Sequence, residues 1–104
     1  MNGRPVYIRG VNRYEHHPKY GHYVPRETVE KDIELMKRLN VNAIRTCHYP
    51  ADPYLYELCD RYGLYICDEA NIESHGLGAA LQAPYDFDKH IADDPSWEKI
   101  HHDR

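Results

Sequence analysis

The stretch 42–68, NAIRTCHYPADPYLYELCDRYGLYICD, constrains the fold of this chain more than any other stretch. Residues 41–46 are mostly apolar or β-favouring, which predicts a strand that ends at the polar run 47–50. Residues 53–62 carry apolar side chains at helical spacing, and residues 64–68 predict a second strand. Strand, helix and strand in this order are typical of a parallel α/β sheet with covering helices.

The central helix carries its own start and stop signals. Asp52 followed by Pro53 is typical of an N-cap and a first helical residue, and Gly63 is typical of the residue that ends a helix. We therefore expect a short, well-bounded helix between the two strands.

The first forty residues predict another strand, a loop and a helix. The Asn-Gly dipeptide at residues 2–3 is typical of a hairpin turn, so 5–10 is predicted to be a strand whose hairpin partner precedes Met1. A loop over 14–24 then leads to a helix near 25–39. The predicted apolar stripe of this helix is Val29, Ile33 and Met36, widened by Leu35 and Leu39, with Asn40 as its left-handed end.

The last thirty residues carry weaker signals. Residues 77–90 show no sustained period and are predicted to be a loop, after which Asp94 and Pro95 predict a helix from Ser96. A helix of about two turns is marginal in water, so we expect the chain to be a piece of a longer protein.

Polar side chains follow both central strands where each strand ends. His48 follows the first, and Glu73 and His75 lie in the loop after the second. The carboxyl ends of parallel strands share one edge, so a site is expected there. From the residues alone, His48 fits either a ligand contact or a loop role. Glu73 and His75 fit either a metal site or a solvated loop, because the Glu-X-His pattern is short.

Charge and hydropathy exclude several classes of protein. The 104 residues include 17 acidic and 13 basic ones, a net charge of −4, without a basic run. Nucleic acids and anionic membranes are therefore not expected as partners. No apolar run is long enough to be a transmembrane helix, and the first ten residues do not resemble a signal peptide.

The three cysteines are Cys47, Cys59 and Cys67, an odd number without metal-ligand spacing. They fall on a strand end, a helix face and a strand, so we expect buried, reduced thiols. This pattern favours a reducing compartment, which we expect to be the cytoplasm.

Several interlocking motifs resemble signatures of glycoside hydrolase family 2, and most closely those of its β-galactosidases. The resemblance extends from residue 2 to about residue 97. The matching motifs are GVNR at 10–13, EHHP at 15–18, the residues Asn42, Arg45, His48, Tyr49, Pro50, Asp60 and Gly63, DEANIE at 68–73, His75 with Gly76, and DDP at 93–95 with Trp97.

This resemblance implies a partial (β/α)8 TIM barrel. Residues 1–104 would be the N-terminal part of the catalytic barrel, comprising its first three βα units, since a complete barrel needs roughly 250 residues. The implied parent hydrolyses terminal β-D-galactosides such as lactose with retention, and it is a homo-oligomer. A family relative acting on another β-sugar, such as a glucuronide, and a non-catalytic sugar- or metal-binding module are the alternatives.

The resemblance also implies roles for particular residues. His48 would bind galactose. From the residues alone, Arg45 needs a carboxylate partner, which a structural salt bridge would supply. The resemblance instead implies a place for Arg45 beside the catalytic nucleophile. Tyr14 stands where many relatives have a substrate-contacting histidine, a departure that leaves the sugar preference open. Glu73 and His75 would bind an active-site magnesium ion, with a third protein ligand from the acid/base glutamate.

The catalytic carboxylates themselves are not expected in this chain. Asp68, Glu69 and Glu73 could suggest the paired carboxylates of a retaining glycosidase. In this family, however, the acid/base and the nucleophile come from later strands, and the chain contains no Asn-Glu dipeptide. Asp68 and Glu69 are instead expected to bond neighbouring strand-end groups, and the isolated chain is expected to be inactive and poorly stable.

Two further groups of residues have open interpretations. Glu15, His16 and His17 fit a functional cluster and an exposed loop equally well. Trp97 fits packing better than stacking on a sugar, because it follows Pro95 in a short helix.

Overall fold

A computed structural model describes residues 1–75 and 90–104. The chain forms two compact units, residues 1–69 and 70–104, and each is described by itself. None of the helices in the described residues is long and apolar enough to cross a bilayer.

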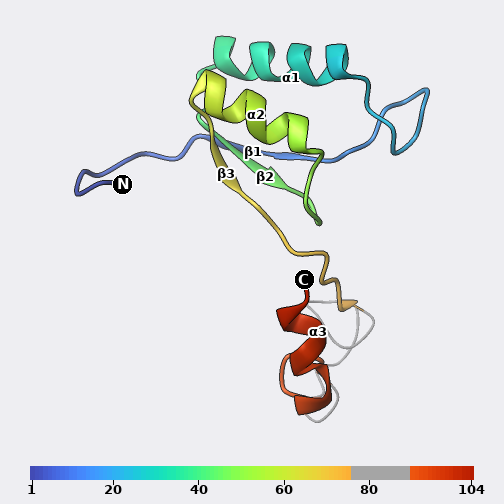
Figure 1. The fold of residues 1–104 in the computed structure, drawn as a ribbon. Helices are drawn as coiled ribbons and strands as arrows, with labels where there is room; N and C mark the ends of the chain where they lie inside the picture. Colours follow the sequence, from blue (N-terminus) through green and yellow to red (C-terminus); the bar gives the residue numbers. More distant parts are fainter. Residues whose placement is uncertain (76–89) are drawn as a thin grey trace. The chain divides into compact units, whose positions relative to one another are not determined.

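The first unit is a parallel sheet covered by two helices. Strands β1 (Gly10–Arg13), β2 (Ala43–Thr46) and β3 (Tyr65–Cys67) pair in the order β1-β2-β3. Helices α1 (Arg26–Arg38) and α2 (Pro53–Tyr62) both lie on one face of this sheet (Figure 1). The predicted parallel order and the one-sided helical cover are therefore confirmed, as right-handed crossovers require.

The first strand starts later than predicted. The prediction placed it over 5–10, whereas β1 begins at Gly10. The reason is Asn42, whose side-chain oxygen accepts from the Arg9 amide at 2.7 Å and whose side-chain nitrogen donates to the Tyr7 carbonyl at 2.9 Å. The Asn42 backbone amide also donates to the Arg9 carbonyl at 3.0 Å, and beyond this one backbone bond the Asn42 side chain takes the place of ladder hydrogen bonds before Gly10.

The turn predicted at Asn2 and Gly3 is present. Both residues have positive φ, 49° and 72°, and the Arg4 amide donates to the Met1 carbonyl at 3.0 Å. Two successive left-handed residues are what this type of hairpin turn requires.

The core of the first unit lies between the helices and β2. α2 is bounded as predicted, since Asp52 accepts from the Tyr54 amide at 2.8 Å and Gly63 has φ 67°. The fully packed side chains are Val29, Ile33, Ile44, Leu55, Leu58, Cys59 and Leu64. Ile44 and Thr46, which share one face of β2, are both buried, whereas on the other face Ala43 is buried and Arg45 is only half-buried.

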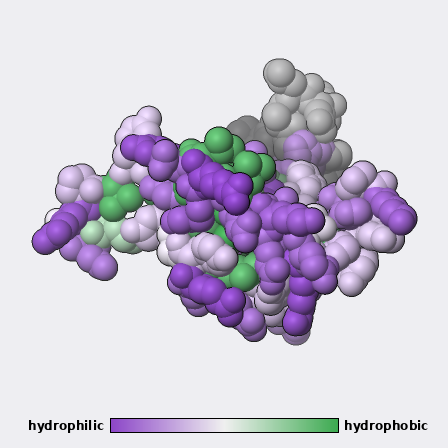
Figure 2. Space-filling view, turned by 90° about the horizontal axis from the view of Figure 1, so that it is seen from above, coloured by the Kyte–Doolittle hydropathy of each residue, from purple (hydrophilic) through white to green (hydrophobic). Residues whose placement is uncertain are grey.

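The predicted apolar stripe of α1 is partly wrong. Val29 and Ile33 are buried and Met36 packs against the core, but Leu35 and Leu39 are 56% and 67% exposed. Leu35 follows Ile33 by two positions, which is about 200° around a helix, so it faces away from the core. The view from above in Figure 2 shows a mainly hydrophilic surface with hydrophobic patches. The left-handed Asn40, with φ 58°, is confirmed.

The cysteines differ from the expectation at one position. Cys47 and Cys59 are buried, and burial raises the pKa of the Cys59 thiol to about 11. Cys67 is exposed, because it lies on the uncovered face of β3 beside Arg45 in the sheet register. All three are free thiols.

Among its described residues, the second unit has a short helical segment over residues 95–102. The 3-10 turn η2 (Pro95–Trp97) runs into α3 (Glu98–His102), and Asp94 accepts from the Ser96 amide at 2.9 Å. The predicted helix start after Asp94 is therefore confirmed. The loop predicted over 77–90 lies outside the described residues except for His90.

Candidate functional site

Three side chains meet where β2 and β3 end, and we call them the strand-end cluster: Arg45, His48 and Glu69. The Arg45 Nε donates to one oxygen of Glu69, and the His48 Nδ1 lies 2.9 Å from the other. The Arg45 Nη2 is 3.3 Å from the same ring nitrogen. Arg45 therefore has a carboxylate partner, Glu69, inside this chain, and its position beside a catalytic nucleophile stays a prediction.

Charge and hydrogen bonding in this cluster support the ionised forms of both partners. The pKa of the Glu69 carboxyl is held below its usual range, first by the hydrogen bond from His48 and then by the one from Arg45, against an opposing effect of burial. The pKa of Arg45 is raised, mainly by its hydrogen bond with Glu69. Both side chains are partly exposed, so the cluster is open to solvent on one side.

Tyr14 joins this cluster from the end of β1. Its ring meets the His48 ring edge-on, with centroids 5.4 Å apart, and the Tyr49 ring at 6.3 Å. Tyr14 is half exposed, whereas the Tyr49 hydroxyl is buried without a hydrogen-bond partner among the described residues. Three predicted substrate-binding residues, Tyr14, Arg45 and His48, are thus brought together at one edge of the sheet.

A second set of hydrogen bonds fixes the backbone and side chains next to the strand-end cluster. The Thr46 hydroxyl donates to Asp68 at 3.0 Å and accepts from the Glu69 amide at 3.0 Å. The Tyr56 hydroxyl of α2 also donates to Asp68, at 2.7 Å, and accepts from the Ala51 amide at 2.8 Å. Burial and the bond to Asp68 raise the pKa of Tyr56. The expectation that Asp68 and Glu69 bond strand-end groups is confirmed.

Glu15, one of the open predictions, has a structural partner. It pairs with Arg13, whose guanidinium is buried and also donates to Asp32 of α1 at 3.2 Å. The neighbouring histidines make loop contacts: His17 stacks on Tyr20 with centroids 4.8 Å apart. This arrangement favours the loop interpretation of that segment.

Cys47, His48 and Glu69 place three ligand-type atoms within 4.8 Å of one another. The arrangement does not favour a cation, because the Arg45 guanidinium already occupies Glu69. The Cys47 thiol also donates to the Arg45 carbonyl at 3.7 Å, so the cysteine serves the loop rather than an ion.

Glu73 and His75 lie in the second unit. Their side chains touch, with 2.7 Å between a Glu73 oxygen and the His75 Nδ1, and both are about half exposed. Two adjacent side chains with ligand-type atoms fit part of the ligand shell of a metal ion, although magnesium prefers oxygen to imidazole nitrogen. That Glu73 and His75 share one strand-end edge with Arg45 and His48 stays a prediction.

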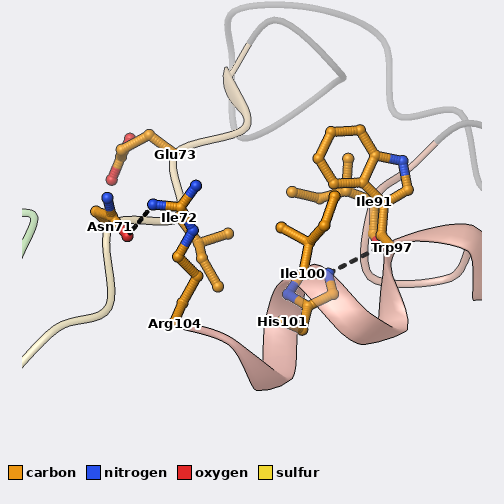
Figure 3. A pocket seen from close by; sticks show the side chains of 8 residues that line it. All are labelled: Asn71, Ile72, Glu73, Ile91, Trp97, Ile100, His101 and Arg104. Atoms are coloured by element: carbon orange, nitrogen blue, oxygen red, sulfur yellow. Dashed lines mark hydrogen bonds between the residues drawn. The ribbon is translucent and has the colours of Figure 1, made fainter.

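The second unit also holds a small cavity of about 110 Å³ (Figure 3). It is lined by Asn71, Ile72, Glu73, Ile91, Trp97, Ile100, His101 and Arg104. Arg104 donates to Asn71 at 3.1 Å, and His101 contacts the Ile91 carbonyl at 3.0 Å. The cavity is below the roughly 300 Å³ at which ligand pockets begin. Trp97, which lines it, is 37% exposed, so its packing role stays a prediction.

The sequence predicted that Glu69 bonds strand-end groups, but it did not identify Arg45 and His48 as its side-chain partners or the Thr46 hydroxyl that accepts from its amide. The available signal was an acidic pair at the end of one strand and an arginine on the neighbouring strand, because parallel strands bring their ends together.

Comparison with known proteins decides the family. Residues 1–104 match the TIM barrel domain of the family described as "Glycosyl hydrolases family 2". The chain belongs to glycoside hydrolase family 2. A β-galactosidase of Vibrio vulnificus is 53% identical over 97 residues, which are 93% of this chain and 9% of that protein. A β-galactosidase of Pectobacterium atrosepticum is 49% identical over all 104 residues, again 9% of its length.

Solved structures agree with the observed fold. A Bifidobacterium dentium β-glucuronidase in complex with coumarin-3-O-glucuronide has a TM-score of 0.64 and 38% identity, covering 66% of this chain and 11% of the enzyme. A β-galacturonidase of Eisenbergiella tayi bound to galacturonate gives 0.64 and 40%, covering 66% and 12%. The chain spans about a tenth of the length of the relatives that it matches. The expected membership of family 2 and the partial TIM-barrel fold are confirmed.

Proposed function

We propose that this chain is the N-terminal part of the catalytic barrel of a β-galactosidase, whose full-length form hydrolyses terminal β-D-galactosides with retention. The observation that carries the proposal is the gathering of Tyr14, Arg45 and His48 at the carboxyl ends of parallel strands, the face on which TIM-barrel enzymes build their sites. The curated relatives named above as β-galactosidases support the choice of sugar.

Each of these residues has a chemical role in the proposal. His48 accepts or donates a hydrogen bond with a sugar hydroxyl, and the Tyr14 ring covers part of an apolar sugar face. Arg45 keeps a neighbouring nucleophilic carboxylate ionised and oriented, since a guanidinium stabilises the charged form. These groups bind and orient the substrate, and they transfer no proton to the glycosidic oxygen.

The carboxylates that break the glycosidic bond come, in this proposal, from a part of the full-length protein outside these 104 residues. Cleavage with retention needs one carboxylic acid to protonate the leaving oxygen and one carboxylate to attack the anomeric carbon. Here Glu69 is held by Arg45 and His48, and Asp68 by Thr46 and Tyr56, so neither acidic group is poised to attack. We expect no hydrolysis of a chromogenic β-galactoside by the 104-residue chain above background.

Magnesium is the cofactor that the proposal assigns to Glu73 and His75. The Glu73 carboxylate supplies an oxygen ligand and His75 a nitrogen, with water and a further protein carboxylate completing the shell. When bound, the ion supplies a fixed positive charge that orients nearby carboxylates. Isothermal titration of the full-length protein with magnesium tests this: Glu73→Gln should weaken binding at least tenfold, with Glu98→Gln as the control. Unchanged affinity in Glu73→Gln would overturn the ligand assignment.

A β-glucuronide is the second candidate substrate, because solved relatives include β-glucuronidases and a β-galacturonidase. Those enzymes must bind a sugar carboxylate. The Nε of Arg45 is engaged by Glu69, but its Nη groups remain as donors, so the geometry of Arg45 does not choose between the two sugars. The identity to the β-galactosidases favours the neutral galactoside.

A substrate panel tests the proposed function. We expect the full-length protein to hydrolyse a chromogenic β-galactoside with a much higher kcat/KM than the β-glucuronide. His48→Ala should lower kcat/KM about 10- to 100-fold, the effect of removing one partner of a buried hydrogen bond, while His102→Ala should not change it. Preference for the glucuronide, or an unaltered His48→Ala variant, would contradict the proposal. A non-catalytic module would hydrolyse neither substrate.

Light scattering on the same sample tests the expected homo-oligomer.

A further inference from the structure

We propose that Glu69 is a positioning residue that fixes the tautomer of His48 and the direction of the Arg45 guanidinium. Its effect on these two side chains rests on geometry. Its consequence for sugar binding rests on the function proposed above.

Glu69 is held at both ends. Its backbone amide donates to the Thr46 hydroxyl at 3.0 Å, and Thr46 is buried in the sheet. One carboxylate oxygen accepts from the Arg45 Nε, and the other lies 2.9 Å from the His48 Nδ1. A carboxylate with its backbone and both oxygens engaged has little freedom to rotate, so it can impose an orientation on its partners.

The distances select one tautomer of His48. An ionised carboxylate only accepts hydrogen bonds, so a nitrogen 2.9 Å from a Glu69 oxygen carries the proton. The Arg45 Nη2, which only donates, is farther from the same nitrogen, at 3.3 Å. The shorter, charge-assisted contact prevails, which places the proton on Nδ1 and makes Nε2 the acceptor nitrogen of the neutral ring. The lowered pKa of Glu69 is consistent with this ionised state.

This tautomer determines what His48 offers to a sugar. With the proton on Nδ1, a substrate hydroxyl donates to Nε2 and keeps its own lone pairs for other groups. The Arg45 Nε is committed to Glu69, so the guanidinium is oriented with its Nη groups as the remaining donors. Side chains as exposed as these contribute little to folding through an ion pair, which favours a role in orientation over one in stability.

The isosteric variant Glu69→Gln tests whether Glu69 orients His48 or only contributes to stability. The donor-only guanidinium of Arg45 will take the amide oxygen of the glutamine, which turns the amide NH2 toward the His48 Nδ1. That nitrogen must then accept, so the proton moves to Nε2. The matched control is Glu57→Gln, which neutralises an exposed carboxylate of α2 in the same unit.

The readout is ¹⁵N NMR of the histidine ring nitrogens in the 104-residue chain, at a pH at which the rings are neutral. The signals of His48 are assigned by their loss in His48→Phe. We expect the Nδ1–H form in the wild type and in Glu57→Gln, and mainly the Nε2–H form in Glu69→Gln. An Nε2–H wild type, or the same tautomer in wild type and Glu69→Gln, would overturn the inference.

The kinetic consequence is measured separately on the full-length protein. There, Glu69→Gln should lower kcat/KM for the β-galactoside about tenfold or more, as the loss of a group that orients a functional histidine typically does. If the tautomer changes as expected but the full-length protein hydrolyses no galactoside, the positioning role stands and the proposed function fails. If galactoside hydrolysis is present and kcat/KM is unaffected in Glu69→Gln, the positioning role in catalysis is wrong and the proposed function stands.

Discussion

The buried face of α2 provides a stringent test of the packing described above. Leu58 is 1% exposed in the core, whereas Leu35 on α1 is 56% exposed, and both lie inside helices. The same change, leucine to alanine, can therefore be made at a buried and an exposed position with similar effects on helix propensity.

The expected magnitudes follow from the burial. Leu58→Ala removes three carbon atoms from a packed site, a transfer loss of about 2.4 kcal/mol, and the remaining cavity brings the cost to about 3 kcal/mol. Leu35→Ala should change the free energy of unfolding by no more than about 0.5 kcal/mol. Natural domains have about 0.05–0.15 kcal/mol of stability per residue, or roughly 3–10 kcal/mol for a first unit of 69 residues. Because the isolated chain is expected to be poorly stable, its value should lie at the low end of this range, and the loss at Leu58 alone is then most of the total.

The assay is urea unfolding of the 104-residue chain, followed by far-ultraviolet circular dichroism for both variants at one protein concentration. Leu58→Ala should lose most of its cooperative transition, while the midpoint of Leu35→Ala should stay close to that of the wild type. Equal destabilisation by the two changes would show that α1 and α2 do not pack against the sheet as described.

Three further predictions concern the polar and thiol groups. Thr46→Val should lower the free energy of unfolding by about 1–3 kcal/mol in urea titrations, because it removes the hydroxyl that accepts from the Glu69 amide and one of the two hydrogen bonds to Asp68, which keeps the bond from Tyr56, whereas Thr46→Ser should largely retain it. The lowered pKa of Glu69 implies stability that is present above its unfolded pKa of about 4.3 and lost as the pH falls through the lower folded value. Acid titrations should therefore show a weaker pH dependence for Glu69→Gln than for the wild type. A thiol reagent should modify Cys67 rapidly in the folded chain but Cys47 and Cys59 only on unfolding, and uniform reactivity would contradict the observed burial.

The parts of the fold that were predictable from sequence are those with local signals. Asp52 and Gly63 define α2 because a cap and a left-handed glycine act on neighbouring backbone groups. The order and direction of the strands followed from the alternation of strand and helix. The start of β1 was not predictable, because it depends on the Asn42 side chain more than thirty residues away.

In the candidate site, too, the features with local sequence signals were predictable and the long-range contacts were not. His48 and Arg45 stand out in the sequence because they lie at a strand end, and the structure brings both to Tyr14. Glu69 bridges Arg45, which lies 24 positions earlier, and His48, which lies 21 positions earlier. The periodicity of the sequence does not indicate contacts between residues so far apart. The predicted apolar stripe of α1 was too wide, because a leucine in a helix is buried only when it lies on the side of the helix that faces the core.

The central claim is that the ends of these strands bind the sugar of a β-galactoside. A crystal structure of the full-length protein with bound galactose tests it most directly. We predict sugar hydroxyls within hydrogen-bonding distance of the His48 Nε2, with Tyr14 in contact with the sugar and Arg45 beside the nucleophilic carboxylate. Galactose bound at another face of the barrel, with His48 and Tyr14 remote from it, would contradict the account.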